Sequence, residues 1–304
     1  MKFNTEKFKG VAVALNSLYD ENNNLNIEAT KALVQKYKEL GVNGIYAGGS
    51  TGEGFLLSTE ERKQLAAAVK EVTGDDMYLI VHVGSASTKE ACELAKHAES
   101  IGADAISAVP SVYYRLPEAS IALHWNTITE AADLPFIIYN IPVLTGYDLS
   151  YNLFKKMCEN EKVIGIKNSS DSTCQIERFS QLGGKDFVVF NGPDEQFLAG
   201  RLMGAKAGIG GTYGTMPELF VHINKLIEKG EIEKAKVWQN RINECIFDLL
   251  SCPSLYGASK AVMTLRFGID CGKPRLPFLP LEDAEKAKAI ADKIDMYVAM
   301  AKAE

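Results

Sequence analysis

Hydrophobic and polar positions alternate in blocks along the chain. Short apolar runs are separated by longer segments in which apolar residues recur at helical spacing. Several runs, such as YLIVHV and PFIIYNIP, are almost continuously apolar, which is typical of parallel strands buried on both faces. The eight expected strands are Val11–Leu15, Gly44–Ala47, Tyr78–Val83, Ala105–Val109, Phe136–Tyr139, Val163–Ile166, Phe187–Phe190 and Ala207–Ile209.

The segments between these runs carry helix start and stop signals. In a capping box, a Ser or Thr oxygen and a Glu carboxylate satisfy free N–H groups of the first turn. Proline suits the first turn of a helix, and glycine suits the residue just past the last turn. The boxes are expected at Ser58–Glu61, Ser87–Glu90 and Thr215–Glu218, the first-turn prolines are Pro117 and Pro217, and the terminal glycines are Gly41, Gly102 and Gly204.

Eight strand–helix units without a linker predict an α/β fold, the closed (β/α)8 TIM barrel. An open doubly wound sheet is disfavoured because neither G-x-G-x-x-G nor G-x-x-x-x-G-K-[ST] occurs. After residue 230 the strand-like runs stop, and three helices are expected at Glu231–Leu250, Tyr256–Phe267 and Glu282–Ala303. We therefore predict a catalytic barrel over residues 1–230 and a C-terminal three-helix extension over 231–304, packed on the barrel as a single structural unit.

Composition narrows the classes of protein without indicating a function. The 304 residues are 46% apolar and 24% charged, which is ordinary for a globular protein. A net charge of −6 without a long Lys/Arg run argues against nucleic-acid binding. The polar N-terminus and the lack of a run near the roughly 18 apolar residues of a membrane span predict a cytoplasmic protein without a membrane partner.

Polar residues follow the expected strands at their carboxyl ends, where barrels of this kind carry their active sites. Lys167 ends the apolar run VIGI, so its amine is expected at the barrel mouth, partly shielded from water. Shielding disfavours the ammonium form and frees an amine that can attack a carbonyl carbon. A structural lysine paired with a carboxylate is the alternative, and position alone does not separate the two.

Tyr139 holds the corresponding position on the preceding strand. Because adjacent parallel strands lie about 4.8 Å apart, its phenol can reach the Lys167 amine and shuttle protons there. The alternative is an aromatic side chain that fills the barrel and has a satisfied hydroxyl. The segment Gly48–Glu53 offers converging backbone N–H groups that suit a carboxylate, or forms a simple tight turn.

Two other chemistries are disfavoured. The four histidines lack the spacing of metal ligands, and no G-x-S-x-G elbow of a serine hydrolase is present. His82 lies within an expected strand, where it can face the core, and the remaining three lie on expected helices.

Five short motifs, taken together and in this order, resemble a known family, although each motif alone is too common to indicate one. The set GSTGE (49–53), YNIP (139–142), GIKNSS (165–170), NGPDE (191–195) and GIGGTY (208–213) resembles the N-acetylneuraminate lyase branch of the dihydrodipicolinate synthase superfamily. The resemblance covers essentially the whole chain. It implies a carbon–carbon lyase that cleaves N-acetylneuraminate to N-acetylmannosamine and pyruvate by a retro-aldol reaction. It also implies a homotetramer, a small-molecule substrate and no cofactor.

The same resemblance implies roles for the catalytic residues. Lys167 would form an imine with pyruvate, and Tyr139 would be the general acid and base. Ser50 and Thr51 would hold the pyruvate carboxylate and help relay protons. Tyr113 would be the aromatic residue inserted across a subunit boundary, with Tyr114 as its competitor.

Substrate choice would rest on further positions. The synthases usually have an arginine five residues after the catalytic tyrosine, and Leu144 stands here, which removes a bidentate partner for a second carboxylate. Two positions depart from the usual lyase pattern: Ser169 replaces threonine, and Gly211 replaces a serine, which puts the exact sugar in question. The residues implied to bind the substrate are Ser50, Thr51, Ser169, Gly192, Asp194, Glu195 and Gly211.

Other functions remain as alternatives. A 2-keto-3-deoxy sugar acid aldolase and a dihydrodipicolinate synthase share the imine chemistry. A non-catalytic sugar-acid binding barrel would not need both Lys167 and Tyr139. A phosphosugar isomerase is disfavoured because Asp194 and Glu195 would repel a phosphate in the loop after the seventh strand.

Overall fold

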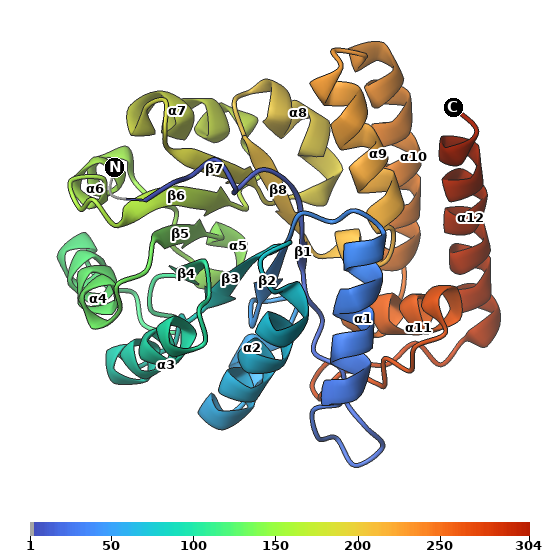
Figure 1. Cartoon of the computed structure of the whole chain (residues 1–304), viewed down its shortest axis with the longest axis horizontal. Helices are drawn as coiled ribbons and strands as arrows, with labels where there is room; N and C mark the ends of the chain where they lie inside the picture. Colours follow the sequence, from blue (N-terminus) through green and yellow to red (C-terminus); the bar gives the residue numbers. More distant parts are fainter. Residues whose placement is uncertain (1–2) are drawn as a thin grey trace.

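The computed structural model describes residues 3–304, in which eight parallel strands close into a barrel surrounded by helices (Figure 1). Each strand pairs with its neighbours in sequence, and β1 also pairs with β8, which removes both sheet edges. The predicted (β/α)8 barrel is thus confirmed. The strands are β1 Gly10–Ala14, β2 Gly44–Ala47, β3 Tyr78–His82, β4 Ala105–Ala108, β5 Phe136–Asn140, β6 Val163–Asn168, β7 Val188–Asn191 and β8 Ala207–Gly210.

Where the strand ends differ from the apolar runs, they differ by one or two residues. Strands β5 and β6 continue past the predicted ends at Tyr139 and Ile166, because Asn140 pairs with Asn168 in the ladder. Backbone pairing does not require apolar side chains. The hydrophobic pattern alone therefore predicted strands that end too early. The extension places Lys167 within the strand instead of just after it.

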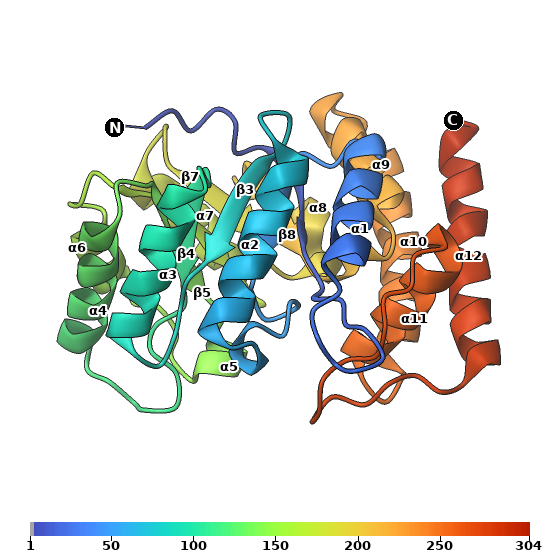
Figure 2. The same cartoon turned by 60° about the horizontal axis from the view of Figure 1, so that its bottom comes forward.

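Helices follow each strand and form an outer ring. Figure 2 shows α10, α11 and α12 together on one side of the molecule, next to α9 and α1. The predicted C-terminal helices are confirmed with small shifts at their ends, whereas the division at residue 230 stays a prediction. The helices are α1 Ile27–Glu39, α2 Thr59–Thr73, α3 Thr88–Ser100, α4 Glu118–Ala131, α5 Pro142–Thr145, α6 Tyr151–Met157, α7 Thr173–Gly183, α8 Phe197–Leu202, α9 Pro217–Glu228, α10 Ile232–Leu250, α11 Leu255–Phe267 and α12 Ala284–Lys302, with short 3₁₀ turns η1 Gly54–Leu56, η2 Asp194–Gln196 and η3 Thr212–Gly214.

The helix-start predictions were partly right. The capping box at Ser58 is present with both of its hydrogen bonds, and Pro217 opens α9. Ser87 caps α3, but the Glu90 carboxylate accepts hydrogen bonds from Thr59 and Ser85 instead of closing the box.

Two predictions at helix starts were wrong. Thr215 does not cap α9, because its hydroxyl donates to the Thr212 carbonyl and Met216 is the N-cap residue. Pro117 precedes α4 as its N-cap instead of lying in the first turn. The predicted glycines after α1, α3 and α8 all adopt positive φ, as a helix end of this kind requires.

The C-terminal helices pack on the barrel through buried side chains. The Tyr37 hydroxyl of α1 lies 3.2 Å from the Met263 sulfur of α11, and the rings of Tyr37 and Phe267 meet edge to face. On the other side of the group, His222 of α9 contacts Trp238 of α10. These contacts attach α11 to α1 and α10 to α9, two helices of the ring around the barrel.

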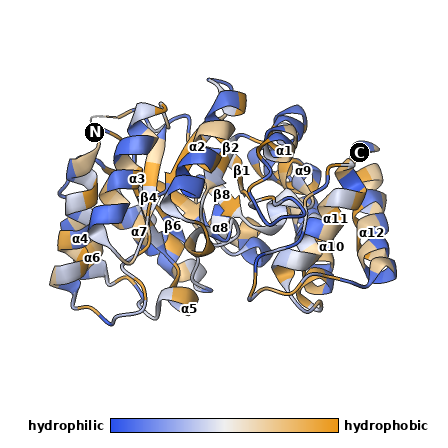
Figure 3. Ribbon diagram, turned by 90° about the horizontal axis from the view of Figure 1, so that it is seen from below, coloured by the Kyte–Doolittle hydropathy of each residue, from blue (hydrophilic) through white to orange (hydrophobic). Residues whose placement is uncertain are grey.

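The core has two layers. One lies between the strands and the helices, and the other fills the barrel interior with side chains such as Phe8, Tyr78, Ile80, Tyr46 and Tyr139. Figure 3 shows apolar strands enclosed by helices that carry both hydrophilic and hydrophobic residues. Because the interior is packed, polar chemistry is confined to the carboxyl end of the strands.

Candidate active site

Lys167 and Tyr139 face each other inside the barrel. They are direct register partners on β6 and β5, and the Lys167 Nζ donates to the Tyr139 hydroxyl over 3.1 Å. Only 5% of Lys167 and 2% of Tyr139 is exposed. The predicted pair is therefore present, shielded from bulk water, and within reach of direct proton exchange.

Aromatic rings surround the amine. The Nζ of Lys167 lies 4.2 Å from the ring centroid of Tyr139 and 4.7 Å from that of Tyr46. Tyr46 in turn donates its hydroxyl to Ser107, and burial raises its pKa well above the ordinary value. Across residues 3–304, the hydrogen-bond partner of Lys167 is a phenol and not a carboxylate, which disfavours the alternative of a structural ion pair.

The sequence placed His82 within a strand, where it can face the core, but gave it no part in the site. It is buried on β3, with its ring 5.8 Å from that of Tyr139. Val109 N–H approaches Nε2 at 3.4 Å, so Nδ1 carries the proton and donates to the Gly48 carbonyl over 3.0 Å. Burial, with Arg62 nearby, lowers the pKa of His82 to about 3, so the ring stays neutral and joins the ends of β2 and β4.

The loop after β2 is folded tightly against its neighbours. A Cβ on Gly54 would lie 2.0 Å from the Gly48 carbonyl oxygen, and one on Gly52 would lie 2.8 Å from that of Leu15. The Ser17 hydroxyl donates to the Gly52 carbonyl over 2.6 Å. The predicted residues Ser50 and Thr51 are half-buried in the middle of this fixed loop.

The loops after β2, β6, β7 and β8 meet around the same opening. A Cβ on Gly211 would lie 2.7 Å from the Thr51 hydroxyl, so these two predicted residues adjoin. A Cβ on Gly192 would lie 2.0 Å from the Ser169 hydroxyl, so those two adjoin as well. The structure thus brings four of the predicted binding residues into two contacting pairs.

Asp194 is held more firmly than a simple rim carboxylate. Its Oδ2 accepts from the backbone N–H of Thr212 at 2.7 Å and from the Thr212 hydroxyl at 2.6 Å. Burial raises its pKa to about 7, against the lowering effect of these two hydrogen bonds. At neutral pH Asp194 is therefore only partly ionised.

An asparagine pair fixes the ends of β5 and β6. Asn140 donates to the Asn168 side chain over 2.8 Å and to Asp148 over 3.1 Å, and its own oxygen accepts from the Leu149 N–H. These contacts hold the two strands in register immediately beyond Tyr139 and Lys167. Only the YNIP and GIKNSS motifs indicated them, without assigning a role.

Several predicted residues lie farther out. Leu144 on α5 is 60% exposed, and Tyr113 and Tyr114 are 92% and 67% exposed. Glu195 is half-buried in η2, where its carbonyl accepts from Asn243. The chain by itself therefore does not bring Leu144 or either tyrosine into contact with Lys167.

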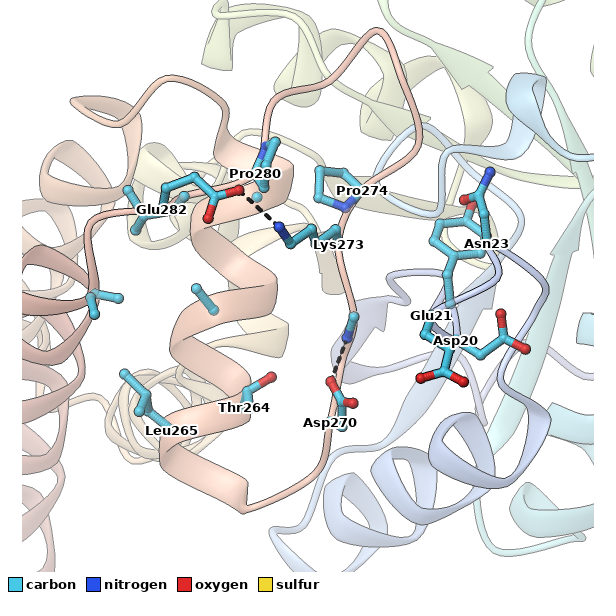
Figure 4. A pocket seen from close by; sticks show the side chains of 17 residues that line it. Asp20, Glu21, Asn23, Thr264, Leu265, Asp270, Lys273, Pro274, Pro280 and Glu282 are labelled. Atoms are coloured by element: carbon cyan, nitrogen blue, oxygen red, sulfur yellow. Dashed lines mark hydrogen bonds and ion pairs between the residues drawn. The ribbon is translucent and has the colours of Figure 1, made fainter.

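A separate cavity of about 810 Å³ lies away from the barrel mouth. Its lining comes from the segment after β1, from α11, from the segment between α11 and α12, and from the first turn of α12 (Figure 4). Asp20, Asn23, Asp270 and Lys273 are among its residues, whereas Lys167 and Tyr139 are not. Chemistry, and not cavity size, places the candidate active site at the barrel mouth.

Within residues 3–304, no group of three or more His, Cys, Asp or Glu side chains is arranged to hold a metal ion. Over the same range, no helix has the length and apolar character to cross a membrane.

Comparisons with known proteins agree with the geometry. A model of the dihydrodipicolinate synthetase family matches residues 7–294. The N-acetylneuraminate lyase of Mediterraneibacter gnavus is 42% identical over 295 residues, covering 96% of this chain and 94% of that protein. The N-acetylneuraminate lyase of Rhizobium meliloti is 35% identical, with 92% and 93% covered. A solved structure of a catalytic lysine mutant of Ruminococcus gnavus sialic acid aldolase has a TM-score of 0.94 at 41% identity, covering 98% of this chain and 97% of that one.

A closed (β/α)8 barrel with a buried amine and phenol at its mouth defines a class of protein suited to imine chemistry. The chain belongs to the dihydrodipicolinate synthetase family.

Proposed function

We propose that this protein is an N-acetylneuraminate lyase that cleaves its substrate to N-acetylmannosamine and pyruvate through an imine on Lys167. The observation that carries the proposal is the buried contact of 3.1 Å between the Lys167 Nζ and the Tyr139 hydroxyl. Family membership and the names of the similar lyases support the choice of reaction and substrate.

The proposed reaction begins with the amine of Lys167 adding to the C2 carbonyl of the open-chain sugar acid, with loss of water. Tyr139 accepts the proton of the C4 hydroxyl, and the C3–C4 bond breaks. The bonding electrons move into the protonated imine to give an enamine, and C4 leaves as the aldehyde of N-acetylmannosamine. Protonation at C3 and hydrolysis then release pyruvate and the free amine, so the imine is the electron sink and no cofactor is needed.

The loops around the opening supply the proposed binding groups. Ser50 and Thr51 would hold the pyruvate carboxylate, since the loop presents hydroxyl and backbone donors near the mouth. The hydroxylated tail would contact the opposite side of the opening. Its proposed residues are Ser169, Gly192, Asp194, Glu195 and Gly211.

Tyr113 supports a proposed homotetramer in which a neighbouring subunit completes each site. Its φ of 78° is a left-handed conformation that bulky residues rarely adopt, and such strain concentrates at functional positions. Tyr113 is also more exposed than Tyr114, at 92% against 67%. Both features favour Tyr113 as the residue that crosses the subunit boundary.

Reductive trapping tests the proposed imine. Incubation with pyruvate and borohydride is expected to add one stable modification to the chain, located on Lys167 by peptide mass spectrometry. Borohydride without pyruvate is the control and should leave the chain unchanged. An unmodified chain, or modification of a different lysine, would exclude the mechanism.

A panel of sugar acids then tests the substrate. Cleavage of N-acetylneuraminate is expected to exceed cleavage of 2-keto-3-deoxygluconate, with kcat/KM as the measure. The reverse preference would assign the protein to the sugar acid aldolases while leaving the imine chemistry intact.

Leu144→Arg tests the proposed specificity position. Leu144 is 60% exposed, so the substitution should fold normally. The new guanidinium favours a second carboxylate that N-acetylneuraminate lacks, and kcat/KM is expected to fall about tenfold. Leu144→Met is the matched control and should stay close to wild type; equal activity of both variants would show that this position does not select the substrate.

A further inference from the structure

A buried ion pair joins the loop after β2 to the C-terminal helices. The Glu53 Oε1 accepts from the Lys260 Nζ over 2.6 Å, although the two residues are 207 positions apart. The side chains are 0% and 1% exposed, respectively. Neither residue belongs to the proposed chemistry at Lys167.

Both partners are fully engaged. The second oxygen of Glu53 accepts from the Arg275 backbone N–H over 2.7 Å. Lys260 also donates to the Lys273 carbonyl over 3.3 Å and lies 4.2 Å from the ring centroid of Tyr19. Besides the pair itself, which joins the loop after β2 to α11, the contacts on these two charges come from the segment after β1 and the segment between α11 and α12.

The backbone at Glu53 is strained. It has a φ of 54° and a ψ of 30°, a left-handed conformation usually left to glycine. Gly52 and Gly54 on either side pack so tightly that neither leaves room for a Cβ. Because both neighbours are glycines, Glu53 supplies the side chain that can fasten this turn to the surrounding structure.

The loop is fastened at three successive points. His82 donates to the Gly48 carbonyl, Ser17 donates to the Gly52 carbonyl, and Lys260 donates to Glu53. Ser50 and Thr51 lie between the first point and the second. Their placement relative to Lys167 therefore depends on all three contacts.

We propose that Glu53 and Lys260 are positioning residues that hold the Ser50–Thr51 segment in place for the substrate carboxylate, so that the C-terminal helices complete the active site. This inference rests on the proposed function of that segment. A buried ion pair contributes little net stability compared with apolar residues of similar size, so its value here lies in orientation.

The segment between α11 and α12 takes part in the same arrangement. Besides the contacts of Arg275 N–H and Lys273 C=O with the pair, the Arg275 guanidinium forms a salt bridge with Glu61 of α2 and donates to the Leu56 carbonyl over 3.1 Å. Figure 4 shows Pro274 of this segment on the side toward Asn23, whereas Lys273 turns the other way and pairs with Glu282. The segment thus closes over the outer side of the loop after β2.

Three variants test the proposal: Glu53→Gln, Lys260→Met and the double variant. The readout is the pyruvate concentration that gives half-maximal borohydride trapping of Lys167, which does not require the sugar. Each single variant is expected to raise this concentration by about tenfold to a hundredfold, as for a misplaced binding group, while trapping at saturating pyruvate changes less than about threefold.

The double variant separates positioning from folding. It leaves no unpaired buried charge, so its melting temperature should recover relative to the single variants. The half-saturating pyruvate concentration should nevertheless stay high. Recovery of pyruvate binding in step with the melting temperature would overturn the proposal, because the pair would then be purely structural.

Arg266→Met is the matched control. Arg266 is a buried cation on the same helix, but it pairs with Glu218 and Asp295 instead of the loop. It should lower the melting temperature and leave half-saturating pyruvate within about twofold of wild type. An equal loss of pyruvate binding in this control would also overturn the proposal.

Hydrogen exchange gives an independent readout of the loop. Peptides covering residues 48–57 should exchange faster in the Glu53 and Lys260 variants than in Arg266→Met, and equal exchange would contradict the proposed fastening. If wild-type protein is not trapped by pyruvate at all, the proposed function fails and this inference fails with it. Normal wild-type trapping with unaffected variants would refute the inference alone.

Discussion

Lys167→Met is expected to abolish both pyruvate trapping and cleavage of N-acetylneuraminate, with a loss of at least about a thousandfold in kcat/KM. Methionine has a similar length and packs well among Tyr46, Tyr139 and the other apolar residues of the barrel interior. It lacks the amine, so no imine can form. Trapping followed by mass spectrometry and a coupled assay for pyruvate release are the two measurements.

Stability should not fall with activity in this variant. The amine is buried with one phenol partner, and replacing a buried polar group by an apolar one of similar shape is often neutral or stabilising. Thermal unfolding should therefore show a melting temperature equal to or above that of wild type. If the inactive variant is also unfolded, the expected stability is contradicted, and the loss of activity can then not be assigned to the missing amine.

Lys162→Met is the matched control for the same strand. Lys162 lies just before β6, at the opposite end of the barrel, where its amine donates to the carbonyls of Thr129 and Ala132 over 3.0 and 2.8 Å. Residues at this face stabilise the barrel without contacting the active site. Lys162→Met should therefore lose some stability and keep nearly full activity. If Lys167→Met instead keeps substantial activity, the imine mechanism is refuted.

The sequence predicted the barrel because each buried strand needs an apolar run, and each helix needs recognisable ends. The run VIGI before Lys167 and the run before Tyr139 also placed both residues at strand ends, from which their pairing followed. Errors arose where the signal depends on contacts outside the segment. Thr215 and Glu218 fitted the pattern of a capping box. In the structure, however, the Thr215 hydroxyl donates to the Thr212 carbonyl, and the Glu218 carboxylate pairs with Arg266.

Contacts between distant segments account for what the sequence could not supply. Nothing local indicates that Glu53 meets Lys260, because a carboxylate and an amine so far apart in the chain have countless possible partners. His82 was expected within a strand, where it can face the core, but the sequence could not supply its neutral state, which follows from burial and from the Gly48 contact. The raised pKa of Asp194 likewise depends on burial that the motif NGPDE does not encode by itself.

Tyr139→Phe is expected to lower kcat for N-acetylneuraminate cleavage by about a hundredfold to ten-thousandfold, the range for loss of a general acid and base. The ring would remain in the barrel against Tyr46 and His82, so the fold should be preserved. Only the hydroxyl that contacts the Lys167 amine is lost. KM should change much less than kcat, and pyruvate should still be trapped on Lys167, although more slowly.

Tyr46→Phe distinguishes proton transfer from packing. Tyr46 also lies over the Lys167 amine, but its hydroxyl donates to Ser107 and not to Lys167. Both substitutions remove one hydroxyl from a buried ring beside the same amine, so a role in packing or local polarity would give similar losses. A proton shuttle requires the hydroxyl that touches the amine, so Tyr139→Phe should lose at least ten times more kcat than Tyr46→Phe. Comparable losses would reduce Tyr139 to an aromatic residue that fills the barrel, and proton transfer would then have to be assigned to a different group at the mouth.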